Sequence, residues 1–149
     1  MSRAPTTIAT TSARETHALG KSLARHLRGG EIIALVGDLG AGKTVLVKGI
    51  AQGLGITRRI TSPTFLLLRV YPVRQHPTIR RFVHVDAYRV RHAAELLNIG
   101  LDDYLGKPDT ITVIEWADRV KKILPHQPIT ITRGLKKRQN TRRITIHQP

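Results

Sequence analysis

The sequence predicts an α/β fold, a three-layer sandwich whose sheet mixes parallel and antiparallel strands. The apolar run EIIALV at residues 31–36 has no polar alternation, which is typical of a strand buried on both faces. Helical patterns lie before and after this run, and later strand-like runs are joined partly by short turns and partly by helices. Hairpins and crossovers in one chain indicate a sheet of mixed direction.

The length and composition indicate one domain spanning residues 1–149. The chain has 149 residues, of which 40% are hydrophobic, and no repeat or linker divides it. It has no cysteine, which excludes a disulfide framework and suits a reducing cytoplasm. Its apolar runs are much shorter than the roughly 20 residues of a membrane helix, and no secretory signal is recognisable. We therefore expect a cytoplasmic protein without a membrane anchor.

The N-terminal region predicts a frayed end followed by an amphipathic helix. We expect residues 1–7 to be frayed; the alternative, an organellar transit peptide, is suggested by the acid-free, Ser- and Thr-rich start. Ser12 stands three residues before Glu15, which is the signature of a capping box. Leucines at positions 19, 23 and 27 share one helix face, and Gly29 with Gly30 predicts the helix end.

The segment GDLGAGKT at residues 37–44 fits the pattern G-x-x-x-x-G-K-[ST] between a predicted strand and a predicted helix. Glycines let the backbone wrap closely around a polyanion at the amino end of a helix. We therefore expect a P-loop NTPase-like fold, with ATP and Mg²⁺ as cofactors. The expected nucleotide-binding residues of the loop are Gly37, Asp38, Leu39, Gly40, Ala41, Gly42, Lys43, Thr44 and Val45. Lys43 would reach the β- and γ-phosphates, and the Thr44 hydroxyl would hold Mg²⁺. The alternative is a glycine-rich turn without a ligand.

The rest of the chain predicts further strands and short helices. Residues 64–73 and 81–90 are expected to form an antiparallel pair, and residues 109–116 another buried strand. One or two short helices are expected over residues 93–106. Two strands around a basic turn predict a closing hairpin over residues 133–146.

Two acids follow predicted strands, where sheets of this kind place their ligands. Asp86 follows RFVHV, and Glu115 follows ITVI. A phosphate loop with Mg²⁺ needs a carboxylate to orient the metal and a group to position the attacking water. We expect Lys43, Asp86 and Glu115 to be catalytic, and Thr44, Asp86 and Glu115 to bind the metal. The alternative for either acid is a solvated strand end or a helix N-cap.

The charge balance suggests a polyanionic partner. Lysine and arginine number 25 against 10 acids, which gives a net charge of +15. Basic residues are concentrated near the C-terminal end, and the candidate RNA contacts are Lys136, Lys137, Arg138, Arg142 and Arg143. The alternative is a solvated charged face.

An ordered set of motifs closely resembles the TsaE (YjeE) family of small bacterial P-loop ATPases over roughly residues 8–147. The motifs are GDLGAGKT, SPTF at 62–65, HVDAYR at 84–89, IGLDDYL at 99–105 and IEW at 114–116. The resemblance implies slow ATP hydrolysis that supports threonylcarbamoyladenosine formation at position 37 of tRNA. It also implies TsaD and TsaB as partner proteins.

The resemblance implies roles for further residues. Ser62 and Thr64 would lie in a switch-like loop, Asp86 would bind metal or orient water, and Glu115 would lie beside nucleotide and metal. Trp116 would lie near the nucleotide, with a core aromatic as the alternative. The chain departs from the family at Val45, where a second Thr is common, and at Ala117, where the family has Pro.

Two other functions remain open. The same loop serves small-molecule kinases, although no insertion for a lid is apparent. A basic nucleotide-sensing module that binds RNA or a partner would also keep the loop. ATP is favoured over GTP because the sequence contains no Asn-Lys-x-Asp stretch.

Overall fold

The structure is a computed structural model that describes residues 4–63, 65–124, 129–133 and 140–147. The strands are β1 (Thr6–Thr10), β2 (Ile32–Val36), β3 (Leu68–Pro72), β4 (Arg81–Asp86), β5 (Thr110–Glu115), β6 (Ile129–Arg133) and β7 (Arg142–Ile146). The helices are α1 (Ala13–Ala24), α2 (Lys43–Gly53) and α3 (Ala93–Asn98), with 3₁₀ segments η1 (Leu101–Asp103) and η2 (Ala117–Ile123). In this part of the chain no helix has the length and apolar character needed to cross a membrane.

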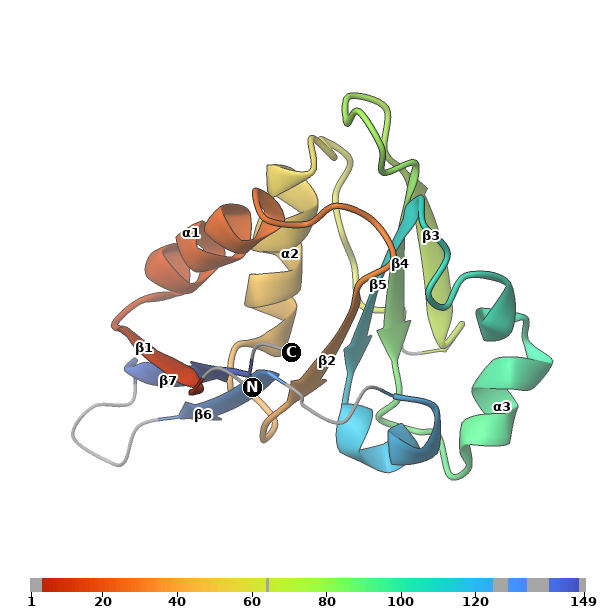
Figure 1. The fold of residues 1–149 in the computed structure, drawn as a ribbon. Helices are drawn as coiled ribbons and strands as arrows, with labels where there is room; N and C mark the ends of the chain where they lie inside the picture. The colour runs from red at the N-terminus through yellow and green to blue at the C-terminus, as the bar shows by residue number, and fades with distance from the viewer. Residues whose placement is uncertain (1–3, 64, 125–128, 134–139, 148–149) are drawn as a thin grey trace.

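The described strands form one sheet in the order β1-β7-β6-β2-β5-β4-β3 (Figure 1). The central strands β6, β2, β5 and β4 run parallel to one another. At one edge β3 pairs antiparallel with β4, and at the other β7 pairs antiparallel with both β6 and β1. The predicted mixed sheet is confirmed, and so are the antiparallel pair and the closing hairpin.

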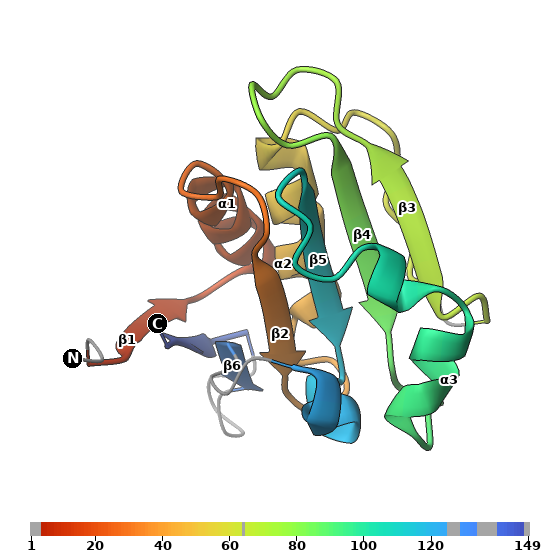
Figure 2. The same cartoon turned by 45° about the vertical axis from the view of Figure 1, so that its right-hand side comes forward.

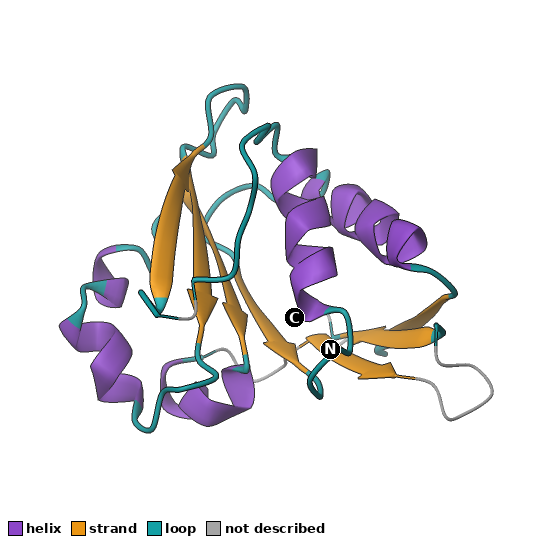
Figure 3. Cartoon of the chain, turned by 180° about the vertical axis from the view of Figure 1, so that it is seen from behind, coloured by secondary structure: helices purple, strands orange, loops and turns teal. Residues whose placement is uncertain are grey.

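Helices cover both faces of the sheet, which gives the predicted three layers. Helices α1 and α2 lie on one face, while α3 and the 3₁₀ segments lie on the other (Figures 2 and 3). Each face has its own core. The first contains Leu46 and Ile50 of α2 with Phe82 of the sheet, and the second contains Val85 with Leu96 of α3. Burial of both sheet faces explains why the central strands are continuous apolar runs.

Helix α1 begins at the predicted Ser12 cap, but it ends at Ala24 and not at the predicted Gly29 and Gly30. The Ser12 Oγ accepts a hydrogen bond from the backbone N–H of Glu15 at 3.1 Å, and the Glu15 carboxylate accepts one from the N–H of Thr11 at 2.7 Å. The first bond satisfies an amide donor that the first helical turn leaves without a partner, and the second ties Glu15 to the residue before the cap. The cap fixes where α1 leaves β1 and crosses over α2.

The two helices cross at glycines, so their backbones approach closely. A Cβ added to Gly20 would lie 2.5 Å from the carbonyl oxygen of Leu46, and one added to Gly49 would collide with the carbonyl oxygen of His17. No side chain fits between backbones at this separation. The crossing holds α2, and therefore the loop in front of it, against the sheet.

Substitution Gly49→Ala is expected to lower the free energy of unfolding by about 1–3 kcal/mol, because the added methyl group overpacks the crossing. For a chain of this size, thermal unfolding should then shift down by roughly 2–4 °C per kcal/mol, as measured by circular dichroism. Gln52→Ala, at an exposed position of the same helix, is the matched control. A Gly49→Ala protein as stable as the parent would contradict the close crossing.

Several elements differ from the sequence-based expectation. Thr6 and Thr7, expected within the frayed terminus, lie in β1, where Thr6 pairs with Ile146. This strand depends on pairing with the other end of the chain, which no local pattern reveals. The strand expected over 64–73 begins only at Leu68, because Leu67 has a left-handed backbone with φ of 62°. Residues 1–3 and the basic turn at 134–139 lie outside the described residues.

Candidate functional site

The loop at residues 37–42 connects the carboxyl end of β2 to the amino end of α2. Gly40 and Gly42 have φ of 75° and 103°, a left-handed backbone that favours glycine. The N–H of Ala41 donates to the carbonyl of Asp38 at 3.0 Å, which closes a tight turn. No side chain caps α2, so its first amide groups and its dipole favour an anion at this end.

This loop forms one wall of a pocket of about 470 Å³. The lining residues come from the loop, from the segment before β3, from the ends of β4 and β5, and from the start of β7. They are Leu39, Gly40, Ala41, Gly42, Lys43, Thr44, Val45, Ser62, Asp86, Tyr88, Glu115, Trp116 and Arg142. The structure therefore brings together most of the predicted nucleotide and metal residues, but Gly37 and Asp38 are not among those that line the pocket. Thr64 lies outside the described residues.

Lys43 is buried with only 5% of its surface exposed. Its Nζ donates to the carbonyl oxygens of Gly37 at 2.5 Å and Asp38 at 2.8 Å, and lies 4.1 Å from the Trp116 ring centroid. Burial lowers the pKa of Lys43, an effect opposed by the carboxylates of Glu115 and Asp38. An ammonium has three N–H donors, so the two carbonyls leave one donor that can reach a phosphate.

The two predicted acids are neighbours across the parallel sheet. Asp86 of β4 is paired in register with Glu115 of β5, so both side chains point to the same face of the sheet. Both are almost fully buried, with 7% and 3% exposed. The Thr44 hydroxyl donates to Glu115 Oε1 at 2.7 Å. This hydrogen bond joins the first turn of α2 to the carboxyl end of β5.

Asp86 joins a different segment to the site. Its Oδ2 accepts a hydrogen bond from the Ser62 hydroxyl at 2.8 Å, and its Oδ1 accepts one from the N–H of Tyr88 at 3.0 Å. The expected switch-like residue Ser62 is therefore in contact with the expected metal ligand Asp86. Movement of the segment around Ser62 would be transmitted directly to this carboxylate.

The oxygen donors of the pocket suit Mg²⁺. This ion prefers hard oxygen ligands in octahedral geometry, and commonly takes one or two carboxylates together with phosphates and water. Thr44, Glu115 and Asp86 supply a hydroxyl and two carboxylates at one end of the pocket. Among the described residues no three His, Asp or Glu side chains gather as a metal site, so phosphate and water would supply the other ligands.

Two aromatic side chains, Tyr88 and Trp116, also line the pocket, and a basic side chain lies against them. Trp116 has φ of 59°, which turns the chain sharply after β5, and its ring lies 4.9 Å from that of Tyr88. The Arg119 guanidinium lies 5.4 Å from the Tyr88 ring centroid and 5.7 Å from that of Trp116. Trp116 both lines the pocket and packs at the margin of the second core, so the two alternatives for it are not exclusive. Sequence reasoning did not single out Arg119.

His84 was also missed. This residue is fully buried, and its Nε2 lies 2.6 Å from Glu115 Oε2. The sequence could have indicated it, because side chains alternate along a strand and His84, two residues before Asp86, lies on the same face of the sheet. Arg89, in the same motif, lies with its guanidinium 4.7 Å from the Phe65 ring centroid.

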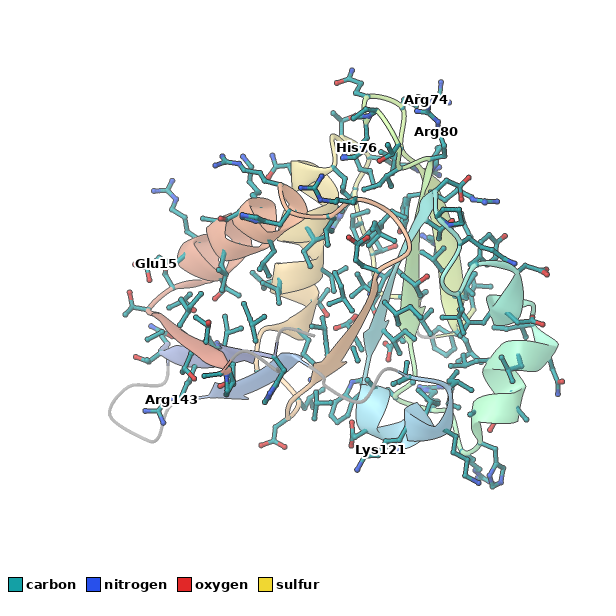
Figure 4. All side chains as sticks on the ribbon, viewed as in Figure 1. Glu15, Arg74, His76, Arg80, Lys121 and Arg143 are labelled. Carbon is teal, nitrogen blue, oxygen red and sulfur yellow. The ribbon has the colours of Figure 1, made fainter. Side chains whose placement is uncertain are left out.

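The candidate RNA contacts lie in different places. Arg142 lines the pocket, and a Cβ added to Gly42 would lie 3.4 Å from its Nε, so this side chain is against the phosphate loop. Arg143 of β7 is exposed at the outer edge of the molecule, far from Arg74 and Arg80 at the top of the view (Figure 4). Lys136, Lys137 and Arg138 lie outside the described residues.

Comparison with known proteins gives consistent matches. The family model described as threonylcarbamoyl adenosine biosynthesis protein TsaE matches residues 10–144. Relatives named tRNA threonylcarbamoyladenosine biosynthesis protein TsaE include one from Bacillus subtilis, 37% identical over 82% of this chain and 73% of its own length. Another, from Treponema pallidum, is 40% identical over 81% of this chain and 85% of its own length. A crystal structure of Bacillus subtilis YdiB has a TM-score of 0.75 and 32% identity, covering 99% of this chain and 86% of that one.

Proposed function

Because this chain belongs to the TsaE family, we propose that it is a magnesium-dependent ATPase of tRNA threonylcarbamoyladenosine biosynthesis. It binds ATP, hydrolyses it slowly, and is required for threonylcarbamoylation of adenosine 37 in the cytoplasm. It acts on a partner complex and not on the base itself. The observation that carries the proposal is the contact of Thr44 with Glu115 beside Asp86, at the mouth of an anion-binding loop.

The residues have distinct roles in this reaction. The amides of the loop and the amino end of α2 hold the phosphates, and Lys43 places its ammonium against the charge that develops on the transferred group. Glu115 and Thr44 hold the metal, while Asp86 orients the attacking water. Bound Mg²⁺ supplies positive charge that neutralises the phosphate oxygens. Catalysis then depends on positioning and charge, with no covalent intermediate on the protein.

The proposed partners are TsaD and TsaB. Two sets of exposed apolar side chains support a protein partner near the nucleotide. Leu39 in the phosphate loop is 76% exposed, and Phe65 and Leu66, directly after the switch-like segment, are 84% and 63% exposed. Large apolar side chains exposed in this way are typical of interaction sites. A partner bound there would sense both the loop and the segment around Ser62.

The fate of the γ-phosphate distinguishes this ATPase from a small-molecule kinase. With γ-labelled ATP, Mg²⁺ and a panel of nucleosides and small alcohols, we expect the label to appear as inorganic phosphate at the same rate with or without acceptors. Removal of Mg²⁺ with a chelator is the control and should stop release. Label recovered on an acceptor would replace the proposed hydrolase with a kinase.

A further inference from the structure

We propose that His84 is a positioning residue that holds one oxygen of Glu115, so that the other oxygen faces Thr44 and the metal position. The inference rests on the proposed function, because it concerns how this chain prepares its Mg²⁺ ligand. It adds a residue that does not itself line the pocket but lies behind one of the lining residues, Glu115.

The register of the sheet brings His84 to Glu115. Along β4, Phe82, His84 and Asp86 face the side covered by α1 and α2, since side chains alternate along a strand. His84 pairs with Val113 of β5, so Glu115 is its diagonal neighbour on the same face. The imidazole therefore lies one step behind the two pocket carboxylates, between them and the core.

The contact with Glu115 indicates which ring nitrogen of His84 carries a hydrogen. His84 is 0% exposed, and its Nε2 lies 2.6 Å from Glu115 Oε2. An ionised carboxylate can only accept, so Nε2 carries the hydrogen and donates it. Among the described residues Nδ1 has no hydrogen-bond partner. Burying a polar ring with one nitrogen unpaired is unfavourable, and an apolar side chain would fill the same space at lower cost. Among the described residues, the hydrogen bond to Glu115 is therefore the interaction that favours histidine at this position.

The pair of bonds immobilises the carboxylate. Glu115 Oε2 is held by His84 from the core side, while Oε1 is held by the Thr44 hydroxyl at 2.7 Å from the pocket side. A carboxylate fastened at both oxygens cannot rotate about its terminal bond without losing one of them. Oε1 and the Thr44 hydroxyl are thus presented together, as two adjacent oxygens, to a metal. Such outer partners typically change metal affinity by about 10–100-fold when they are removed.

Two nearly isosteric variants separate this role from packing. Gln at position 84 keeps an N–H donor of similar reach, whereas Met fills similar space without one. Trp116, the only tryptophan of the chain, lines the pocket and reports binding by fluorescence. At fixed ATP, we expect His84→Met to need at least about 10-fold more Mg²⁺ for half of the signal, and His84→Gln to remain within about 3-fold of the parent. ATP affinity without Mg²⁺ should be unchanged in both.

The control is Thr112→Val on the neighbouring strand β5. Thr112 is fully buried, and its hydroxyl has no hydrogen-bond partner in the described part of the chain, so the change perturbs the sheet core without touching Glu115. It should leave the Mg²⁺ dependence unchanged. Parent-like Mg²⁺ dependence in His84→Met would overturn the inference, and so would equal losses in the Met and Gln variants. Absence of any Mg-ATP response in the parent would instead overturn the proposed function.

A second measurement needs no variant to fold. In protein labelled with ¹⁵N at histidine and assigned by NMR, the His84 ring should carry a hydrogen on Nε2. A hydrogen on Nδ1 and none on Nε2 would remove the donor, and would overturn the inference whatever the variants do.

Discussion

Replacing Lys43 with alanine should abolish ATP hydrolysis and weaken Mg-ATP binding by at least about 100-fold, because the change removes a buried ammonium from the phosphate site. The side chain is 5% exposed, and no other cation of the loop can take its place. The loss should appear in both turnover and calorimetric affinity. The substitution also removes the ammonium group that donates to the carbonyl oxygens of Gly37 and Asp38.

Lys48→Ala is the matched control for this variant. Lys48 lies on the same helix α2, but its side chain is exposed. We expect activity and affinity within about 2-fold of the parent, since exposed charges away from a site contribute little. If the Lys43→Ala protein hydrolysed ATP at the parent rate, the assignment of residues 37–44 as the phosphate loop would be wrong.

Glu115→Gln should lower Mg²⁺-dependent hydrolysis by at least about 100-fold while ATP still binds without the metal. Glutamine keeps the size and an oxygen that can accept from Thr44, but it removes the negative charge that attracts the metal. Its amide also places a donor opposite the Nε2–H of His84, so the bond behind the site is lost. Turnover measured across a Mg²⁺ series gives the readout.

Asp102→Asn, at an exposed position of η1, is the control for Glu115→Gln and should behave as the parent. Asp86→Asn gives a separate comparison. Because Asp86 bonds Ser62 and the backbone of Tyr88, and Glu115 bonds Thr44, the metal dependence should shift more in the Glu115 variant. A larger shift in Asp86→Asn would reverse the roles proposed for the two acids.

Much of the site could be predicted because its signals are local. The loop at 37–44 is contiguous, and its glycines, lysine and threonine each have a defined task. Asp86 and Glu115 could be placed together because they follow predicted strands, and parallel strands end at one edge of a sheet. The Ser12 cap of α1 likewise depends on residues only three positions apart, although the Glu15 carboxylate bonds Thr11 and not Ser12.

The missed features depend on contacts between distant parts of the chain. Strand β1 exists because Thr6–Thr10 pair with β7, more than a hundred residues later. Arg142 was grouped with a basic turn because its neighbours are basic, yet the antiparallel start of β7 directs it against the phosphate loop. The contact of His84 with Glu115 depends on the register of β4 with β5, which the sequence pattern does not reveal.

Titration of the parent protein with ATP, with and without Mg²⁺, tests the central claim most directly. If the backbone from Gly37 to Thr44 encloses a metal-bound triphosphate, calorimetry should show saturable binding that tightens with Mg²⁺, and the fluorescence of Trp116 should change in parallel. No heat of binding and no change in fluorescence at millimolar Mg-ATP would contradict it.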